Sequence, residues 1–388
     1  MAYSWFQNAP MVIGRGALEH LAQVSARRVA LIADLRAAEA SGALQRAGGH
    51  LLQAGCDWTL VYDAKREPRV RDVEQSIGAL RAYAPDTLLA LGGGSALDAA
   101  KALWFFYEFP DATWEQAFTP FALPPLGARA RLIAAPTTSG TGAETTCVAV
   151  LVDQRDRKRL MMSRELIPSL AVLDPDLADS MPSPVAAASG MDALSHALEA
   201  AVCRAASPMV VAMAVEAAAS LIQWLPRSVA GDPGSPLRGQ ARELVHYAAS
   251  RAGMAINNSS AGLAHAMDQA GPRLGIAHGL ACALALPATV EFLGPQPAFS
   301  RIALALGGSG DEAELWRHLL GQLRQLGREL GLPGGYRQCG VAEQEYAALL
   351  PELIQEALAS GSTRLAPLAP DAASFERLFW QAFHGESA

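Results

Sequence analysis

The sequence predicts a chain of two domains, an α/β domain over residues 1–182 and an all-helical domain over residues 183–388. Two observations predict this division. In the first half, short apolar runs alternate with Ala- and Leu-rich stretches, which is typical of a parallel sheet covered by helices. Beyond Pro184 the strand-like runs disappear, and long Ala- and Leu-rich segments follow, separated by loops rich in Gly and Pro.

Each element of this fold can be assigned to a residue range. Four apolar runs in the first half are expected to be buried strands: residues 28–33, 58–62, 87–91 and 132–135. Two stretches between them are expected to be helices: residues 37–54 and 70–82. The helices expected in the second half span residues 184–204, 207–226, 236–256, 278–294, 311–330, 342–360 and 372–384. Loops between these helices contain the Gly and Pro that end them.

Length and composition exclude several classes of protein. The 388 residues are 51% hydrophobic, which is enough for two large cores. The formal net charge of −7 argues against a nucleic-acid partner, because phosphate binding needs a basic face. The most apolar run, from Met209 to Leu221, contains Glu216, so we expect a buried helix there and no membrane span.

The N-terminus and the cysteines both predict a cytoplasmic protein. The first ten residues, MAYSWFQNAP, lack the basic segment and apolar core of a secretory signal. The cysteines are scattered and form no CxxC pair, so we expect reduced, buried thiols in a reducing compartment. They are Cys56, Cys147, Cys203, Cys282 and Cys339.

Two glycine-rich loops follow the third and fourth expected strands. Gly92–Ser95 opens a helix, so its backbone N–H groups and the positive helix end could bind a phosphate or pyrophosphate. It matches neither standard nucleotide fingerprint, and a plain strand-to-helix turn is the alternative. Residues 136–144, rich in hydroxyls, should lie at the same sheet edge, where α/β proteins bind ligands. Asp34 ends the first strand and could accept hydrogen bonds from a ribose.

A second group of residues predicts a metal site. Asp192 and His196 stand four residues apart in a run of helix formers, so both project from one helix face. Further along, His265 and His278 flank a turn that contains glycine. Three imidazoles and one carboxylate suit Zn²⁺ or Fe²⁺ better than Mg²⁺ or Ca²⁺. A simple surface or core Asp–His pair is the alternative, which the small apolar surroundings disfavour.

Four long motifs resemble those of the iron-containing (group III) alcohol dehydrogenases, in the family's order over residues 10 to about 295. The motifs are GGGSALDAAK, PTTSGTGAET, LDPDLADSMPSPVAAASGMDALSHALEA and NNSSAGLAHAM followed by GIAHGLACALALP. The resemblance implies the dehydroquinate synthase-like architecture, an N-terminal α/β nucleotide-binding domain and an all-α C-terminal domain. It also implies NAD and Fe²⁺ as cofactors, with Zn²⁺ possible, and a homodimer or higher homo-oligomer.

The resemblance also implies roles for individual residues. It implies the metal ligands Asp192, His196, His265 and His278. The residues that it implies for cofactor binding are Gly93, Gly94, Ser95, Asp98, Thr137, Thr138, Thr141 and Lys158. Asp34 matches the position at which an acidic residue favours NAD over NADP.

The chain departs from the family pattern between two of these ligands. The family text is close to HAMAHPLGxxxxxPHG, whereas this chain has Gln269 in place of the second histidine and a spacer to His278 that is one residue shorter. We expect a helix begun near Ser260 that brings Gln269 one turn after His265, onto the same face. Asp268 and Gln269 are therefore candidate catalytic residues, with Asp268 either a proton relay or a hydrogen-bond partner of the ligand His265.

The function that these features predict is the interconversion of a small primary alcohol and its aldehyde. A metal would polarise the substrate oxygen while a hydride passes between the substrate carbon and the nicotinamide. One alternative is an NAD- and metal-dependent lyase like dehydroquinate synthase, although few basic residues surround the motifs. Another is a non-catalytic nucleotide- and metal-binding protein, which the change to Gln269 keeps open.

Two further features bear on substrate and assembly. Arg273, in the spacer, could contact an acidic substrate, but a solvent-facing arginine after Pro272 is the favoured interpretation. The apolar stretch over residues 3–13 predicts a terminal strand that pairs with a second subunit, because an uncovered apolar strand is a liability.

Overall fold

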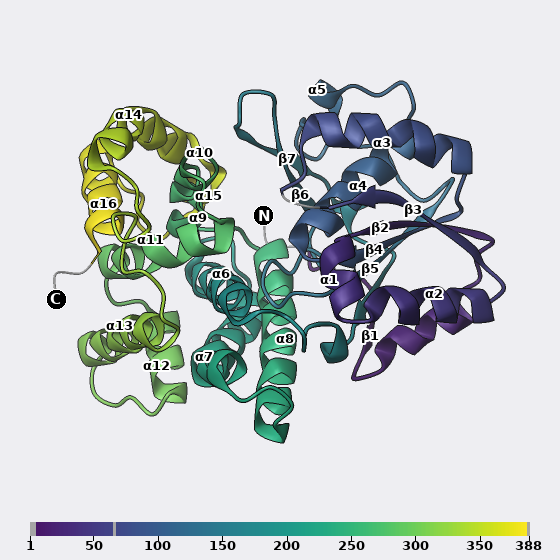
Figure 1. The fold of residues 1–388 in the computed structure, drawn as a ribbon. Coiled ribbons are helices and arrows are strands. Elements are labelled where there is room, and N and C mark those ends of the chain that lie inside the picture. The colour runs from purple at the N-terminus through teal and green to yellow at the C-terminus, as the bar shows by residue number, and fades with distance from the viewer. Residues whose placement is uncertain (1–4, 65–66, 386–388) are drawn as a thin grey trace. The chain divides into compact units, whose positions relative to one another are not determined.

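The computed structural model describes residues 5–64 and 67–385 (Figure 1). The described residues form two compact units, one of residues 7–182 and one of residues 183–385 together with residues 5 and 6. The first unit is α/β and the second is helical, which confirms the predicted fold class.

The first unit is built on a six-stranded parallel sheet with the order β1-β8-β5-β4-β2-β3. Its strands are β1 (Met11–Ile13), β2 (Arg28–Ala33), β3 (Asp57–Asp63), β4 (Thr87–Gly92), β5 (Arg131–Pro136) and β8 (Leu170–Leu173). An antiparallel pair, β6 (Val148–Val152) and β7 (Lys158–Met162), stands apart from this sheet. The sequence predicted β2, β3, β4 and β5, and a terminal strand over residues 3–13 that includes β1, and it missed β6, β7 and β8.

Helices cover both faces of the sheet. Successive strand residues point to opposite sides, so apolar strands give the sheet two apolar faces. Leu89 and Leu91 pack in one apolar cluster, and Leu88 and Ala90 pack in another. The first cluster lies under η1 (Ala17–Gln23), α1 (Leu35–Ala40) and α2 (Ala43–Gln53), and the second under α3 (Val70–Tyr83) and α4 (Gly94–Glu108) (Figure 1). The shorter elements are α5 (Trp114–Ala117), η2 (Arg164–Leu166) and η3 (Pro175–Leu177).

The predicted helix over residues 37–54 is divided in two. Gly42 adopts a left-handed conformation with φ 67°, which a continuous helix cannot contain and which glycine adopts without strain. The chain therefore turns between α1 and α2.

The N-terminal strand is paired within the chain. Met11 and Ile13 of β1 are in register with Ala171 and Leu173 of β8. The predicted terminal strand over residues 3–13 is a strand at residues 11–13, where it pairs with β8 of the same chain, and its pairing with a second subunit stays a prediction. Residues 3 and 4 lie outside the described residues. β1 is an edge strand, so one of its sides is not paired in the sheet.

The strand order creates a crevice where a ligand can bind. From β2 the chain continues to β3 on one side, and from β4 it continues to β5 on the other side. The neighbours β2 and β4 therefore form a topological switch point, and the carboxyl ends of strands at such a point are where open α/β sheets bind ligands. Asp34 and the Gly92–Ser95 loop follow these two strands, and the Asp34 N–H donates to the Leu91 carbonyl at 3.3 Å.

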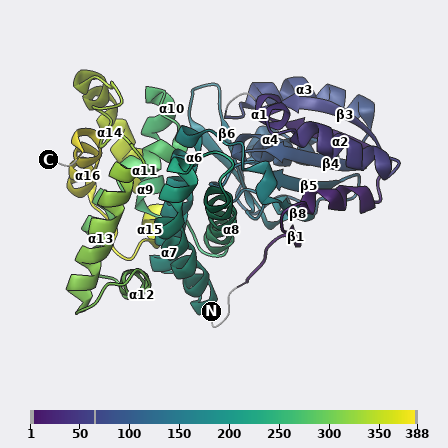
Figure 2. The same ribbon diagram turned by 60° about the horizontal axis from the view of Figure 1, so that its bottom comes forward.

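Every element between residues 183 and 385 is a helix (Figure 2). The helices are α6 (Ser183–Val202), α7 (Pro208–Ala230), α8 (Pro236–Asn257), α9 (Leu263–Met267), α10 (Ala270–Leu274), α11 (His278–Leu293), α12 (Pro297–Ala305), α13 (Glu312–Glu329), α14 (Glu343–Ala359), α15 (Gly361–Leu365) and α16 (Ala372–His384). The seven long helices were predicted. α9 lies within the helix predicted from near Ser260 to Gln269, and the short α10, α12 and α15 were not predicted.

Among the described residues, α7 is the helix that is long and apolar enough to cross a membrane, judged by length and composition alone. It packs against α6 and α8 in the helical unit. Its Glu216 pairs with Arg251 of α8, with Oε2 and Nε 2.7 Å apart. These contacts identify α7 as a core helix of this unit, as the sequence predicted.

Candidate active site

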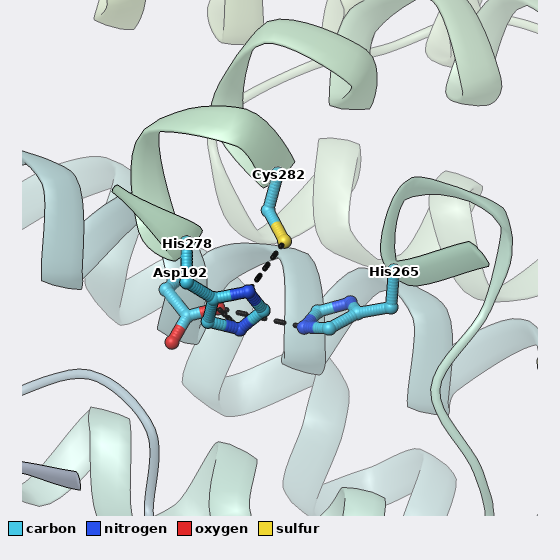
Figure 3. A group of neighbouring side chains, drawn as sticks. All are labelled: Asp192, His265, His278 and Cys282. Atoms are coloured by element: carbon cyan, nitrogen blue, oxygen red, sulfur yellow. Dashed lines mark hydrogen bonds and ion pairs between the residues drawn. The ribbon is translucent and has the colours of Figure 1, made fainter. Parts of the chain in front are cut away.

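The four predicted metal ligands come from three helices of the helical unit. Asp192 and His196 lie one turn apart on α6, His265 lies on α9, and His278 is the first residue of α11 (Figure 3 draws Asp192, His265 and His278). Asp192 and His196 are buried, whereas His265 and His278 are partly exposed. The structure therefore brings together all four residues although α6 and α11 are far apart in the sequence.

The imidazoles converge on one carboxylate oxygen. Asp192 Oδ1 lies 3.9 Å from His196 Nε2, 3.4 Å from His265 Nε2 and 3.3 Å from His278 Nε2. Neighbouring atoms that bind one metal at 2.0–2.2 Å stand about 3.0–3.4 Å from one another, whether the metal has four ligands or also binds a substrate oxygen. Asp192 Oδ1 and His265 Nε2 are also buried without a hydrogen-bond partner, which is costly unless a cation satisfies them. The residues present therefore fit a divalent metal.

Two groups in this cluster, Asp192 and His196, already have the protonation state that suits a metal. Burial raises the pKa of the Asp192 carboxyl, but the imidazoles of His196 and His278 outweigh burial and hold that pKa well below its ordinary value. Burial lowers the pKa of His196 to about 4, so its ring is neutral near pH 7. An ionised carboxylate and a neutral imidazole are the forms that bind metals. Burial lowers the pKa of His265, but Cys282 and Glu199 raise it well above its ordinary value, so this ring must lose a proton when a metal binds.

Two buried carboxylates hold the outer nitrogens of two ligand rings. Glu199 Oε2 lies 2.5 Å from His265 Nδ1, and Asp268 Oδ2 lies 2.6 Å from His278 Nδ1. Burial raises the pKa of Glu199, but the ring of His265 and the Gly262 N–H together outweigh burial, so this pKa lies below its ordinary value. Glu199 is therefore ionised and accepts the Nδ1 proton. In each ring Nε2 is then the nitrogen that lies near Asp192 and that a metal could bind.

One of these carboxylates has another partner than the sequence predicted, and the other was not predicted. The expectation that Asp268 bonds to His265 is wrong, because its carboxylate faces His278. Glu199 was not selected, although Asp192, His196 and Glu199 follow one another at i, i+4 and i+7 on one helix face, a spacing that could have identified it.

Cys282 lies beside the ligands and was expected only to be a core residue. Together with Asp192, His265 and His278 it offers donor atoms that all lie within 4.8 Å of one another (Figure 3). Its Sγ lies 3.8 Å from Nδ1 of His278, the nitrogen that faces Asp268, whereas Nε2 faces Asp192. The thiol therefore borders the outer nitrogen of this ring. Its position one turn after His278 on α11 could have identified it from the sequence.

The predicted continuous helix through residues 260–269 is wrong. α9 begins at Leu263 and ends at Met267, and Gln269 precedes the first residue of α10. Pro272 has no N–H to donate to the Asp268 carbonyl, so Gly271 N donates to that carbonyl instead, at 2.9 Å. Gln269 is half-buried, and its catalytic role stays a prediction.

Arg273 is neither a free cation for an acidic substrate nor a solvent-facing side chain. Its guanidinium pairs with Glu356 at 2.5 Å and with Glu352 at 3.3 Å, both on α14. Arg273 thus connects α10 to α14, and both interpretations offered from the sequence are corrected.

The two glycine-rich loops of the α/β unit lie against each other at the ends of β4 and β5. Gly93 caps the N-terminus of α4, and the Thr137 N–H donates to the Gly92 carbonyl at 2.9 Å. A Cβ on Gly94 would stand 2.7 Å from Thr141 Cγ2, so only glycine allows this approach. The predicted cofactor residues from Gly93 to Ser95 and from Thr137 to Thr141 therefore share one sheet edge.

The other predicted cofactor residues have different surroundings. The Asp98 carboxylate accepts from Val150 N–H at 3.0 Å, so it ties α4 to β6. Lys158 begins β7 and is half-buried. Asp34 caps α1, and its Oδ1 accepts from Ala37 N–H at 3.0 Å.

Known proteins resemble the chain over almost its whole length. The family model for iron-containing alcohol dehydrogenases matches residues 8–175, and the C-terminal model of the Fe-containing alcohol dehydrogenase family matches residues 186–378. An NADPH-dependent butanol dehydrogenase of Clostridium saccharobutylicum is 32% identical over 378 residues, which cover 96% of each chain.

Solved structures agree with these relatives. An iron-containing alcohol dehydrogenase from Thermococcus thioreducens superposes with a TM-score of 0.89 at 31% identity, over 99% of this chain and 100% of that one. A sulfoacetaldehyde reductase from Bifidobacterium kashiwanohense, in complex with NAD⁺, gives a TM-score of 0.86 at 25% identity, over 98% of this chain and 99% of that one.

Proposed function

Because the chain belongs to the iron-containing alcohol dehydrogenase family, we propose that Asp192, His196, His265 and His278 hold its metal. The observation that carries this proposal is the convergence of three Nε2 atoms on Asp192 Oδ1 at 3.3–3.9 Å. The enzyme interconverts an alcohol and an aldehyde with a nicotinamide cofactor. Family membership disfavours the lyase and the non-catalytic alternatives.

The residues of the chain divide the work of this reaction. A metal held by the four ligands supplies Lewis-acid polarisation of the substrate oxygen. Glu199 and Asp268 keep the outer nitrogens of His265 and His278 hydrogen-bonded, so the Nε2 atoms stay available. The N–H groups of Gly94 and Ser95, at the start of α4, are suited to a cofactor pyrophosphate.

We infer that the substrate is a short, uncharged aldehyde or primary alcohol. Small residues surround the ligands in the sequence, and Arg273 is already paired with Glu352 and Glu356. A carboxylate or sulfonate on the substrate would therefore have to compete with two glutamates for this guanidinium.

The test of the proposed function is an NADH oxidation assay of the iron-loaded protein with acetaldehyde, propanal, butanal and a carboxylate-bearing aldehyde. We expect turnover of the uncharged aldehydes and weak turnover of the charged one. A lyase that recycles its cofactor would consume no NADH, and a binding protein would bind NADH without turnover. Either result would defeat the proposal.

We expect Asp34 to make the enzyme prefer NADH over NADPH. Its carboxylate lies at the switch point and would repel a 2′-phosphate, while it accepts from the hydroxyls of an unmodified ribose. Asp34→Gly is therefore expected to narrow the NADH/NADPH ratio of kcat/KM by roughly tenfold or more, which corresponds to about 1.4 kcal/mol. Glycine is tolerated at a helix N-cap, so folding should change little.

The matched control for this variant is Glu39→Gln. It removes the same charge from the exposed side of α1 and should leave the cofactor ratio unchanged. Wild-type kcat/KM that is equal or higher with NADPH would show that Asp34 does not select the cofactor. The relative from Clostridium saccharobutylicum is described as NADPH-dependent, so the family alone does not decide this preference.

The assembly of this chain is a further proposal. We propose a homodimer, because β1 is an edge strand and its Ile13 is 57% exposed. Light scattering should give at least twice the mass of one chain.

We propose a cytoplasmic location, because all five cysteines are free thiols. A secreted or periplasmic pool in cell fractionation would contradict it.

A further inference from the structure

We propose that Asp268 is a positioning residue that fixes the ring of His278 for metal binding and, with Glu199, links the three ligand-bearing helices into one preformed site. This inference rests on the ligand set proposed above. It assigns to Asp268 a role in metal affinity and not in proton transfer.

The geometry of Asp268 is that of a clamp. The residue is 4% exposed, and its Oδ2 lies 2.6 Å from His278 Nδ1. On the other side of the same ring, Nε2 lies 3.3 Å from Asp192 Oδ1. The backbone of Asp268 is itself fixed, because its carbonyl accepts from Gly271 N–H at 2.9 Å at the start of α10. The carboxylate therefore approaches the ring from a rigid turn.

Glu199 forms the matching link between α6 and α9. Its Oε1 accepts from Ala264 N–H at 2.6 Å and from His265 N–H at 3.3 Å, and its Oε2 contacts the His265 ring at 2.5 Å. A Cβ on Gly262 would stand 2.9 Å from Glu199 Cγ, so glycine allows this close packing. Glu199 thus joins α6 to α9, and Asp268 joins the end of α9 to α11.

His278 needs such a clamp more than the other ligands do. Its side chain is 28% exposed, against 11% for His265 and 8% for His196. It is also the first residue of α11, where no side chain caps the helix. A carboxylate on Nδ1 selects the tautomer and the ring orientation that leave Nε2 free to bind.

The clamp on His278 is a feature of this chain. The family pattern HAMAH has alanine where this chain has Asp268, and the spacer to His278 is one residue shorter here. The shortened spacer contains Pro272, which lies in α10 and has no N–H to donate to the Asp268 carbonyl, so α9 and α10 are separate helices on either side of residues 268 and 269. The change of sequence and the contact thus occur together.

The test measures metal binding to the full-length protein after its metal has been stripped. Dissociation constants for Zn²⁺ and Co²⁺ are obtained by competition with a chromophoric chelator, and the visible spectrum of the Co²⁺ form is recorded. Asp268→Ala should weaken binding by roughly 10–100-fold and alter the Co²⁺ bands, because the His278 ring is released. Asp268→Asn should lose less, because an amide oxygen still accepts from Nδ1–H.

The matched control is Glu356→Gln, which also replaces a carboxylate by an amide. Glu356 pairs with Arg273 on α10 and contacts none of the four ligands among the interactions described. It should change the unfolding temperature but not the metal dissociation constant. If Asp268→Ala does not fold, judged by circular dichroism, the comparison of Asp268→Asn with this control decides the question.

Two failures of this experiment have different meanings. If the Asp268 variants bind Co²⁺ with wild-type affinity and an unchanged spectrum while kcat falls, Asp268 acts as a proton relay and the positioning role is wrong. If the wild-type protein itself binds metal no better than a His265→Ala variant, the proposed ligand set is wrong.

Discussion

Replacing His265 with alanine is expected to abolish metal binding and alcohol–aldehyde turnover. Its Nε2 lies 3.4 Å from Asp192 Oδ1, and four protein ligands leave none to spare. We expect kcat to fall by at least about a thousandfold, because polarisation of the substrate oxygen contributes several kcal/mol to the transition state. The measurement is metal content by atomic emission, together with kcat on the purified variant. His278→Ala should behave in the same way.

The control for the histidine variants is His384→Ala. It removes an imidazole from the same helical unit, at the exposed end of α16. It should retain full metal content and rate. Circular dichroism on His265→Ala is also needed, because Glu199 loses its ring partner and becomes a buried carboxylate that only backbone N–H groups satisfy. Full iron and a wild-type rate in a folded His265→Ala variant would remove His265 from the site.

Local sequence patterns were sufficient to predict the elements that are long or strongly apolar. The strands β2, β4 and β5 are almost wholly buried, so their sequences read as continuous apolar runs. β8 has four residues, too few for a period to show, and β1 takes only residues 11–13 of the terminal strand predicted over residues 3–13. β7 was missed because its sequence, KRLMM, begins with two charged residues and is mostly half-buried.

The ligands could be predicted because each has a local signal, whereas their partners are set by tertiary contacts. Asp192 and His196 have helical spacing, and His278 opens a helix. The contact between Asp268 and His278 joins the residues between two short helices to the start of α11, which no local pattern predicts. The partners of Arg273 lie on α14, about 80 residues further along the chain, and no local pattern connects them.

Gly279 is where the start of α11 rests on α6, and it makes the placement of His278 sensitive to one methyl group. A Cβ at this position would stand 2.4 Å from the Ala188 carbonyl oxygen and 3.2 Å from Asp192 Cβ. A carbon–oxygen contact normally requires roughly 3.3 Å. The obstacle is helix backbone and cannot rotate away, so in Gly279→Ala the start of α11 must move from α6 by on the order of 1 Å. His278, the adjacent residue, moves with it.

We therefore expect Gly279→Ala to weaken metal binding by roughly 10–100-fold, and kcat to fall by about a hundredfold, because misplacement of about 1 Å is costly in catalysis. The control is Gly321→Ala in α13, where a Cβ meets nothing within 4 Å. That control should be stabilised by about 0.4–1 kcal/mol, as alanine reduces the freedom of the unfolded chain, and should keep the wild-type metal affinity. The contrast between the two variants separates the general effect of alanine in a helix from the displacement of His278. Wild-type metal affinity and rate in Gly279→Ala would mean that α11 does not rest on α6 this closely, and the position of His278 would then be fixed by Asp268 alone.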